Sequence, residues 1–114
     1  MLCAKEYQPL ASLFPGVHVI HAPFDDSGRA MTTAEAAIAI QAAKAVATLL
    51  KLRRPVLVTC AMGLNRSGLV AALALLYARK LDAETAVARV RAARGAGALA
   101  NQDFVKLIAH VARR

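Results

Sequence analysis

The chain has 114 residues and a mass of 12.0 kDa, which allows one domain and excludes two. Hydrophobic residues make up 58% of it and charged residues 19%, a balance that excludes a disordered polar chain and requires a packed core. The formal charge of +8 favours anionic partners, so that phosphorylated ligands or nucleic acid are expected.

The cysteine content and the N-terminal residues indicate in which cellular compartment the protein is expected. Cys3 and Cys60 are too few for a disulfide scaffold and lack the paired spacing of a structural zinc site. The chain does not open on a basic region followed by an apolar stretch, as a secretory signal does, and its longest apolar stretch, residues 69–78, is about half of the ~20 residues that cross a bilayer. We expect a cytoplasmic protein without a membrane span, a metal or another cofactor.

The first half of the chain contains a strand pattern and a helix pattern. Residues 17–22 are rich in β-branched side chains and lie between two prolines, which predicts a short strand. The Pro, Asp, Ser and Gly residues of 23–29 predict a loop. Thr32 has a Glu three residues later, the spacing of a capping box, and apolar residues at helical intervals continue to about Leu52.

The second half predicts one more strand and three helices. Residues 55–59 are apolar and β-branched, which is typical of a strand buried on both faces of a parallel sheet. The short loop 61–65 leads into a helical pattern over residues 67–80. Two further helices are predicted, each with a capping side chain at its start: Asp82 to about Arg94, and Asn101 to about Val111. This order predicts an α/β fold, a small parallel sheet flanked by helices.

A cysteine and an arginine separated by five residues lie between the predicted buried strand and its helix. A short loop at a helix N-terminus aims successive backbone N–H groups at one point, where the helix dipole also favours negative charge. Arg66 adds a planar, charged fork that can bind two phosphate oxygens. The residues predicted to surround a phosphoryl group are Ala61, Met62, Gly63, Leu64, Asn65 and Arg66.

Cys60 lies at the mouth of this cradle, where the helix end and Arg66 favour thiolate over thiol. We predict that Cys60 attacks phosphorus to form a cysteinyl-phosphate, and that the Ser67 hydroxyl steadies the thiolate as it leaves. Asp26, or its neighbour Asp25, is the predicted general acid for the leaving group and the base for water. The competing interpretations are a buried, inert cysteine and two turn-forming aspartates.

These motifs resemble the cysteine-dependent protein tyrosine phosphatase superfamily, in particular its small dual-specificity branch, whose signature is a cysteine, five residues, an arginine and Ser or Thr. Residues 22–27 look like its general-acid loop, 56–68 like its phosphate loop, and 94–104 like the Arg…Asn…Phe segment that closes its domain. The resemblance implies one such domain over residues 1–114, with these roles: Cys60 the nucleophile, Arg66 the phosphate-binding arginine, Ser67 the hydroxyl helper, and Asp26, which directly precedes the polar Ser27, the general acid.

The resemblance implies a phosphoprotein phosphatase that acts on phosphotyrosine, with phosphoserine and phosphothreonine as further candidate substrates. Residues 2–6 and 22–26 look like the phosphatase-and-tensin-homologue group, in which the equivalent cysteine can pair with the nucleophile, so that Cys3 is a candidate redox partner of Cys60. Residues 63–68 are similar to the phosphate loop of RNA 5′-triphosphatases, and the basic charge suits RNA. Removal of RNA 5′ phosphates is therefore the alternative activity.

Two departures from the family pattern add alternatives. Thr59 stands where the family usually has His, which leaves open a non-catalytic phosphate-binding module. The chain begins at what looks like the family's third strand, so that we expect about three to four parallel strands, including strands from about Leu2, 17 and 55. The edge beside residues 55–59 would then be open, and we expect either that a partner chain or a second copy covers it or that the chain is a reduced or truncated domain.

Overall fold

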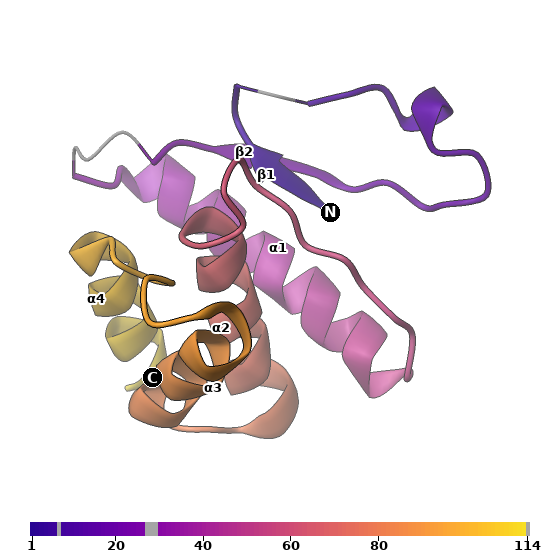
Figure 1. Cartoon of the computed structure of the whole chain (residues 1–114). Helices are drawn as coiled ribbons and strands as arrows, with labels where there is room; N and C mark the ends of the chain where they lie inside the picture. The colour runs from indigo at the N-terminus through magenta and orange to yellow at the C-terminus, as the bar shows by residue number, and fades with distance from the viewer. Residues whose placement is uncertain (7, 27–29, 114) are drawn as a thin grey trace.

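In the part of the chain that the structure describes, two short strands are followed by four helices (Figure 1). The structure is a computed structural model that describes residues 1–6, 8–26 and 30–113. Its elements in chain order are β1 (Leu2–Ala4), the 3-10 turn η1 (Ala11–Leu13), β2 (His21–Phe24), α1 (Thr33–Lys51), α2 (Arg66–Arg79), α3 (Ala83–Arg94) and α4 (Gln102–Ala112). The element order and the α/β class agree with the prediction.

The two strands form a parallel sheet, and β1 also has a neighbour on its other side. Leu2 is paired with His21 on one side, and with Thr59 through an isolated parallel bridge on the other. Two backbone hydrogen bonds hold this bridge, from the Cys3 N–H to the Thr59 carbonyl at 2.9 Å and from the Thr59 N–H to the Met1 carbonyl at 3.0 Å. The order in space is therefore β2, β1 and the segment that ends at Thr59.

Both predicted strand ranges need correction. The strand expected over residues 17–22 is β2, at His21–Phe24, and Pro23 lies inside it instead of bounding it. Proline lacks an N–H group, but β2 is an edge strand and tolerates that loss. Residues 55–58 form no strand, because the bridge to β1 involves only Thr59. Among the described residues the sheet has two strands, where three to four were expected.

The helix boundaries follow local capping signals, as predicted. Thr32 and Glu35 form a complete capping box at the start of α1. The Asp82 side chain accepts a hydrogen bond from the Thr85 N–H at the start of α3. The Asn101 side chain accepts from two N–H groups at the start of α4. These side chains satisfy N–H groups that have no partner within the helix, so that the helices begin where the capping residues stand.

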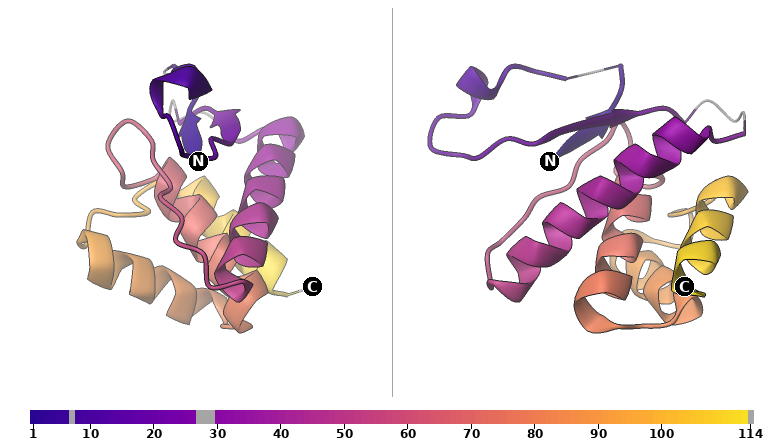
Figure 2. Two further views of the ribbon diagram at one scale, coloured as in Figure 1. Left: turned by 90° about the vertical axis from the view of Figure 1, so that its right-hand side faces the viewer. Right: turned by 180° about the vertical axis from the view of Figure 1, so that it is seen from behind.

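The core is built around α2, which contacts α1, α3, α4 and β1. Its apolar run is buried on nearly every side, including the fully buried Leu69 and Leu73, as the uniformly apolar sequence predicts. Phe24 from β2 meets Phe104 from α4 edge to face, with ring centroids 6.0 Å apart. Figure 2 shows from two further sides that the strands lie at one end of the helical layer.

Helix α1 is the one described helix that is long and apolar enough to cross a membrane, by length and composition. Core helices of soluble proteins pass the same test, and α1 packs against α2 and β2 through buried residues that include Ala39, Ala43 and Val46. Residues 69–78, the longest apolar stretch of the sequence, form the middle of α2. In this fold α1 buries one face, on which Ala39, Ala43 and Val46 lie, against the rest of a globular α/β domain.

Candidate active site

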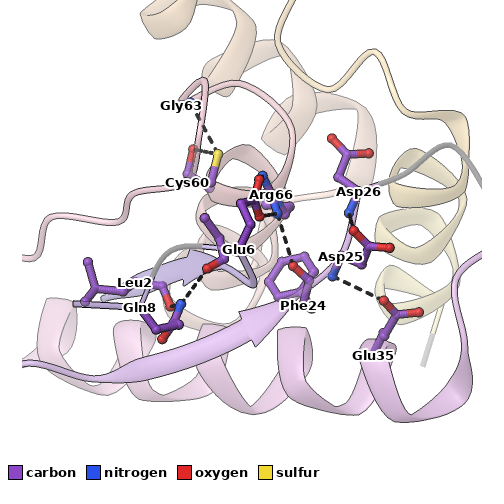
Figure 3. A network of polar contacts seen from close by, with 12 residues as sticks. Leu2, Glu6, Gln8, Phe24, Asp25, Asp26, Glu35, Cys60, Gly63 and Arg66 are labelled. Atoms are coloured by element: carbon purple, nitrogen blue, oxygen red, sulfur yellow. Dashed lines mark hydrogen bonds and ion pairs between the residues drawn. The ribbon is translucent and has the colours of Figure 1, made fainter. Parts of the chain in front are cut away.

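The predicted phosphate loop lies between the bridge at Thr59 and the first turn of α2 (Figure 3). Gly63 has a φ of +70°, a left-handed conformation that glycine adopts without the steric cost of a Cβ atom. Asn65 stands at the N-cap of α2, but its side chain makes no capping hydrogen bond there. The first N–H groups of α2 therefore face the loop without a side-chain acceptor at the cap, which is the arrangement that binds anions.

The sulfur of Cys60 lies inside this loop. Its Sγ is 3.4 Å from the Ser67 Oγ and accepts a hydrogen bond from the Gly63 N–H at 3.3 Å. Partial burial by itself raises the pKa of the Cys60 thiol, but the hydrogen bonds from Ser67 and from loop N–H groups outweigh it and leave the pKa below the usual 9.0. The loop thus favours the nucleophilic thiolate.

Arg66 is buried, and its guanidinium group is held from two sides. Its Nη1 and Nη2 donate to the Glu6 Oε1 and Oε2 at 2.5 Å and 2.8 Å, and Nη1 also donates to the Phe24 carbonyl at 3.3 Å. The hydrogen bond to Arg66 lowers the pKa of Glu6 to about 2, and the same contact raises the pKa of Arg66. Glu6 was not predicted as a site residue.

These contacts leave one edge of the guanidinium group for a ligand. The guanidinium group of an arginine has five N–H hydrogens. One hydrogen of Nη1 and one of Nη2 bind the Glu6 carboxylate, and the second hydrogen of Nη1 binds the Phe24 carbonyl. Within the described residues, Nε and the remaining hydrogen of Nη2 have no acceptor. They point along the same edge, which is the side-on geometry that binds two oxygens of a phosphate.

Three contacts from residues 94–101, the end of α3 and the connection to α4, support the loop. The Arg94 Nε donates to the Gly63 carbonyl at 3.1 Å, and the Leu99 N–H donates to the Leu64 carbonyl at 3.1 Å. The Asn101 N–H donates to the Asn65 Oδ1 at 3.2 Å. Residues 94–101 thus bind three successive loop residues on the side away from Cys60 through their carbonyl and side-chain oxygens. The Gly63 N–H remains directed at the Cys60 sulfur.

The two candidate acids differ in their surroundings. The Asp26 Oδ1 accepts a hydrogen bond from the Asn101 Nδ2 at 2.6 Å, and Asp26 lies within electrostatic range of Arg66. The Asp25 Oδ1 accepts from the Asp26 N–H at 2.9 Å, and the Asp25 N–H donates to Glu35 of α1 at 3.2 Å. Figure 3 shows Arg66 between Cys60 and Asp26. Ser27, the polar neighbour used in assigning Asp26, lies outside the described residues.

The structure brings most of the predicted site residues together. Cys60, Arg66 and Ser67 meet at the start of α2, and Asp26 approaches them from the loop after β2. Two residues that contact them, Glu6 and Asn101, were missed as site residues. Asn101 was recognised only through its helix-capping position, and nothing in the spacing of Glu6 pointed to Arg66, 60 residues further on.

Cys3 is fully buried in β1, next to the phosphate loop. Its N–H donates to the carbonyl of Thr59, the residue before Cys60. Burial raises the pKa of the Cys3 thiol to about 12, and the nearby Cys60 contributes to that shift. Both cysteines are free thiols in this structure: burial disfavours the thiolate of Cys3, whereas the loop contacts favour the thiolate of Cys60.

A cavity of about 650 Å³ opens beside the loop, between residues 56–62 and helices α1, α2 and α3. Its walls are mostly apolar, and Cys60 and Ser67 reach it from the loop. Arg89 and Arg94 of α3 add positive charge to its lining.

One of three comparisons with known proteins found a match. The family model described as the dual specificity phosphatase catalytic domain matches residues 4–114, nearly the whole chain. A search of curated proteins and a search of solved structures found no significant match.

Proposed function

The chain belongs to the dual specificity phosphatase catalytic domain family, within the protein tyrosine phosphatase superfamily, and from this premise we propose that it hydrolyses phosphotyrosine esters through Cys60. Phosphoserine and phosphothreonine are further candidate substrates. The reaction proceeds through a cysteinyl-phosphate and uses no metal ion, because Arg66 and the loop N–H groups supply the positive charge that the phosphoryl oxygens need.

The observation that carries this proposal is the placement of the Cys60 sulfur in the loop at the start of α2, within hydrogen-bond distance of the Ser67 hydroxyl and the Gly63 N–H. Ser67 and Gly63 contact the sulfur at 3.4 Å and 3.3 Å, and the pKa of the thiol lies below its usual value because these and other hydrogen bonds outweigh burial. A merely structural cysteine in an apolar core has the opposite shift, as Cys3 does.

In the first step, the Cys60 thiolate attacks phosphorus while the bond from phosphorus to the ester oxygen breaks. The free edge of Arg66 binds two phosphoryl oxygens and gains strength as charge collects on them in the transition state. Asp26 gives its proton to the leaving oxygen, so that an alcohol or phenol departs in place of its anion.

In the second step, water attacks the cysteinyl-phosphate. The Asp26 carboxylate takes a proton from that water, and the bond between sulfur and phosphorus breaks to return the Cys60 thiolate and inorganic phosphate. The Ser67 hydroxyl, 3.4 Å from the sulfur, turns its proton toward the departing thiolate. Asp26 ends the cycle protonated, as it began.

The test is hydrolysis of para-nitrophenyl phosphate by the reduced protein in EDTA, with Cys60→Ser as the inactive variant. We expect turnover in the wild type, competitive inhibition by vanadate, and a loss of at least about 10³-fold in kcat for Cys60→Ser. A folded wild type that binds vanadate without turnover would refute the enzyme and support a phosphate-binding module. Thr59→Val serves as the matched control, since the Thr59 hydroxyl contacts the Met1 carbonyl instead of the sulfur.

Removal of RNA 5′ phosphates is a second candidate function, favoured by the net charge of +8 and by Arg89 and Arg94 beside the catalytic loop. A phosphoanhydride leaving group needs less protonation than an alkoxide. If this were the activity, Asp26→Ala would leave hydrolysis of a 5′-triphosphorylated oligonucleotide nearly unchanged, whereas the same variant would hydrolyse phosphotyrosine about 10²-fold or more slowly than the wild type.

We also propose that Cys3 protects Cys60 during oxidation. Peroxide converts the Cys60 thiolate to a sulfenic acid, and the Cys3 thiol displaces water from it to form a disulfide. We expect peroxide-treated wild type to recover fully with dithiothreitol, and Cys3→Ser to lose activity irreversibly under the same treatment. Equal recovery of the two proteins would contradict this role for Cys3.

The segment at residues 55–59, which reaches β1 only through the bridge at Thr59, remains a proposed interface with a partner chain or a second copy, in a cytoplasmic protein. Within the described residues, no backbone hydrogen bond involves Val56 or Val58, so their N–H and C=O groups are available to a partner. Light scattering with size-exclusion chromatography tests self-association, and a strictly monomeric protein at high concentration would exclude the second copy.

A further inference from the structure

Asn101 makes more contacts than capping a helix requires. Its Oδ1 accepts hydrogen bonds from the Asp103 and Phe104 N–H groups at 3.0 Å and 3.4 Å, and this capping leaves the side-chain Nδ2 pointing away from α4. That Nδ2 donates to the Asp26 Oδ1 at 2.6 Å, across 75 residues of sequence. Because the cap fixes which end of the amide is oxygen, it also fixes which end faces Asp26.

The other capped helices show that the amide group is not needed for capping. Thr32 at the start of α1 and Asp82 at the start of α3 do the same work with a side-chain oxygen alone. What asparagine adds at residue 101 is a pair of N–H donors, and one of these contacts the carboxylate of the predicted general acid.

From this geometry we propose that Asn101 is a positioning residue for the general acid. Its amide binds the Asp26 Oδ1 and leaves Oδ2, which has no hydrogen-bond partner within the described residues, to carry the proton to the leaving oxygen. A carboxylate held at one oxygen loses less rotational freedom when it meets the substrate, so the amide accelerates only the proton transfer. This inference rests on the proposed phosphatase activity.

Asn101 also connects the acid loop to the phosphate loop. Its backbone N–H donates to the Asn65 Oδ1 at 3.2 Å, and Asn65 directly precedes Arg66. Asp26 is therefore held relative to the residue that grips the phosphoryl group. Since α4 is anchored in the core through Phe104, which is 1% exposed, this link has a rigid base.

The test uses Asn101→Ser, which keeps a capping oxygen and removes the amide, with Asp82→Ser as the matched cap exchange remote from the site. Two substrates are compared: phenyl phosphate, whose leaving group needs a proton, and 2,4-dinitrophenyl phosphate, whose leaving group does not. We expect Asn101→Ser to lower kcat for phenyl phosphate by about tenfold and for the dinitrophenyl ester by less than about twofold. Asp82→Ser should change neither.

A double-mutant cycle completes the test. In an Asp26→Ala background, Asn101→Ser should lower kcat for phenyl phosphate by less than about a further twofold, because the carboxylate that the amide positions is absent. Equal losses on the two substrates, or an undiminished loss in the Asp26→Ala background, would overturn the role of Asn101 while wild-type turnover upheld the proposed function. A wild type that hydrolyses neither ester would overturn the proposed function, and this inference with it.

Discussion

The contact between Ser67 and the Cys60 sulfur predicts a measurable pKa change when Ser67 is replaced by alanine. Ser67 is 6% exposed, and its hydroxyl is 3.4 Å from a sulfur whose pKa is lowered by hydrogen bonds against the effect of burial. A hydrogen bond to a charged group contributes about 1.5–3 kcal/mol, and the lower end applies here because the contact is long and the sulfur is half-buried. One pKa unit corresponds to about 1.4 kcal/mol. We therefore expect Ser67→Ala to raise the pKa of Cys60 by about one unit.

The assay is the rate of alkylation by iodoacetamide as a function of pH, which follows the thiolate fraction. Cys3 does not interfere, because it is fully buried and its pKa is raised to about 12. Thr59→Val is the control, since its hydroxyl lies next to Cys60 in sequence but contacts the Met1 carbonyl at 3.4 Å. An alkylation midpoint that is the same in Ser67→Ala and in the wild type would refute the assignment of the lowered pKa to this hydroxyl.

The same shift has a consequence for stability. The pKa of Cys60 in the folded protein lies below the usual 9.0, so that the ionised thiol stabilises the fold fully above pH 9.0 and loses this effect as pH falls through the folded pKa. The difference in unfolding free energy between the wild type and Ser67→Ala should therefore grow as pH rises from 7 toward 9. Urea unfolding at several pH values measures this difference, and a difference independent of pH would contradict it.

Two further substitutions test the supports of the phosphate loop. Glu6→Gln should weaken the hydrogen bonds that orient Arg66 and raise KM for para-nitrophenyl phosphate by about tenfold. Its effect on the free energy of unfolding should vanish as pH falls from 4.5 to about 2, because the hydrogen bond to Arg66 lowers the pKa of Glu6 to about 2. An unchanged KM would argue against this role. Gly63→Ala should lower stability by about 1–3 kcal/mol and reduce vanadate binding, since Gly63 has a φ of +70° and an added Cβ would lie 3.0 Å from the Arg94 Nη2. Gly97→Ala, where an added Cβ meets nothing within 4 Å, should be nearly neutral in thermal unfolding, and equal losses in the two glycine variants would refute the steric argument.

Local features of the fold could be predicted from the sequence because they depend on residues close together in the chain. The capping residues Thr32, Asp82 and Asn101 each bind N–H groups within the next three residues, so that composition and spacing reveal them. The phosphate loop is equally local, since Cys60 and Arg66 belong to one strand-to-helix turn. The helix starts and the candidate anion-binding loop could therefore be predicted from the sequence alone.

Only the tertiary structure decided what surrounds that loop. The contacts of Glu6 with Arg66 and of Asn101 with Asp26 join residues 60 and 75 positions apart, and no periodicity connects such distant residues in a single sequence. The strands were misplaced for a related reason: residues 17–22 and 55–59 both carry strand-forming side chains, but a strand exists only where a neighbour offers hydrogen-bond partners. The three-residue β1 offers them to His21–Phe24 on one side and to Thr59 alone on the other, so the pairing, and with it the position of Cys60, was decided by the assembled fold.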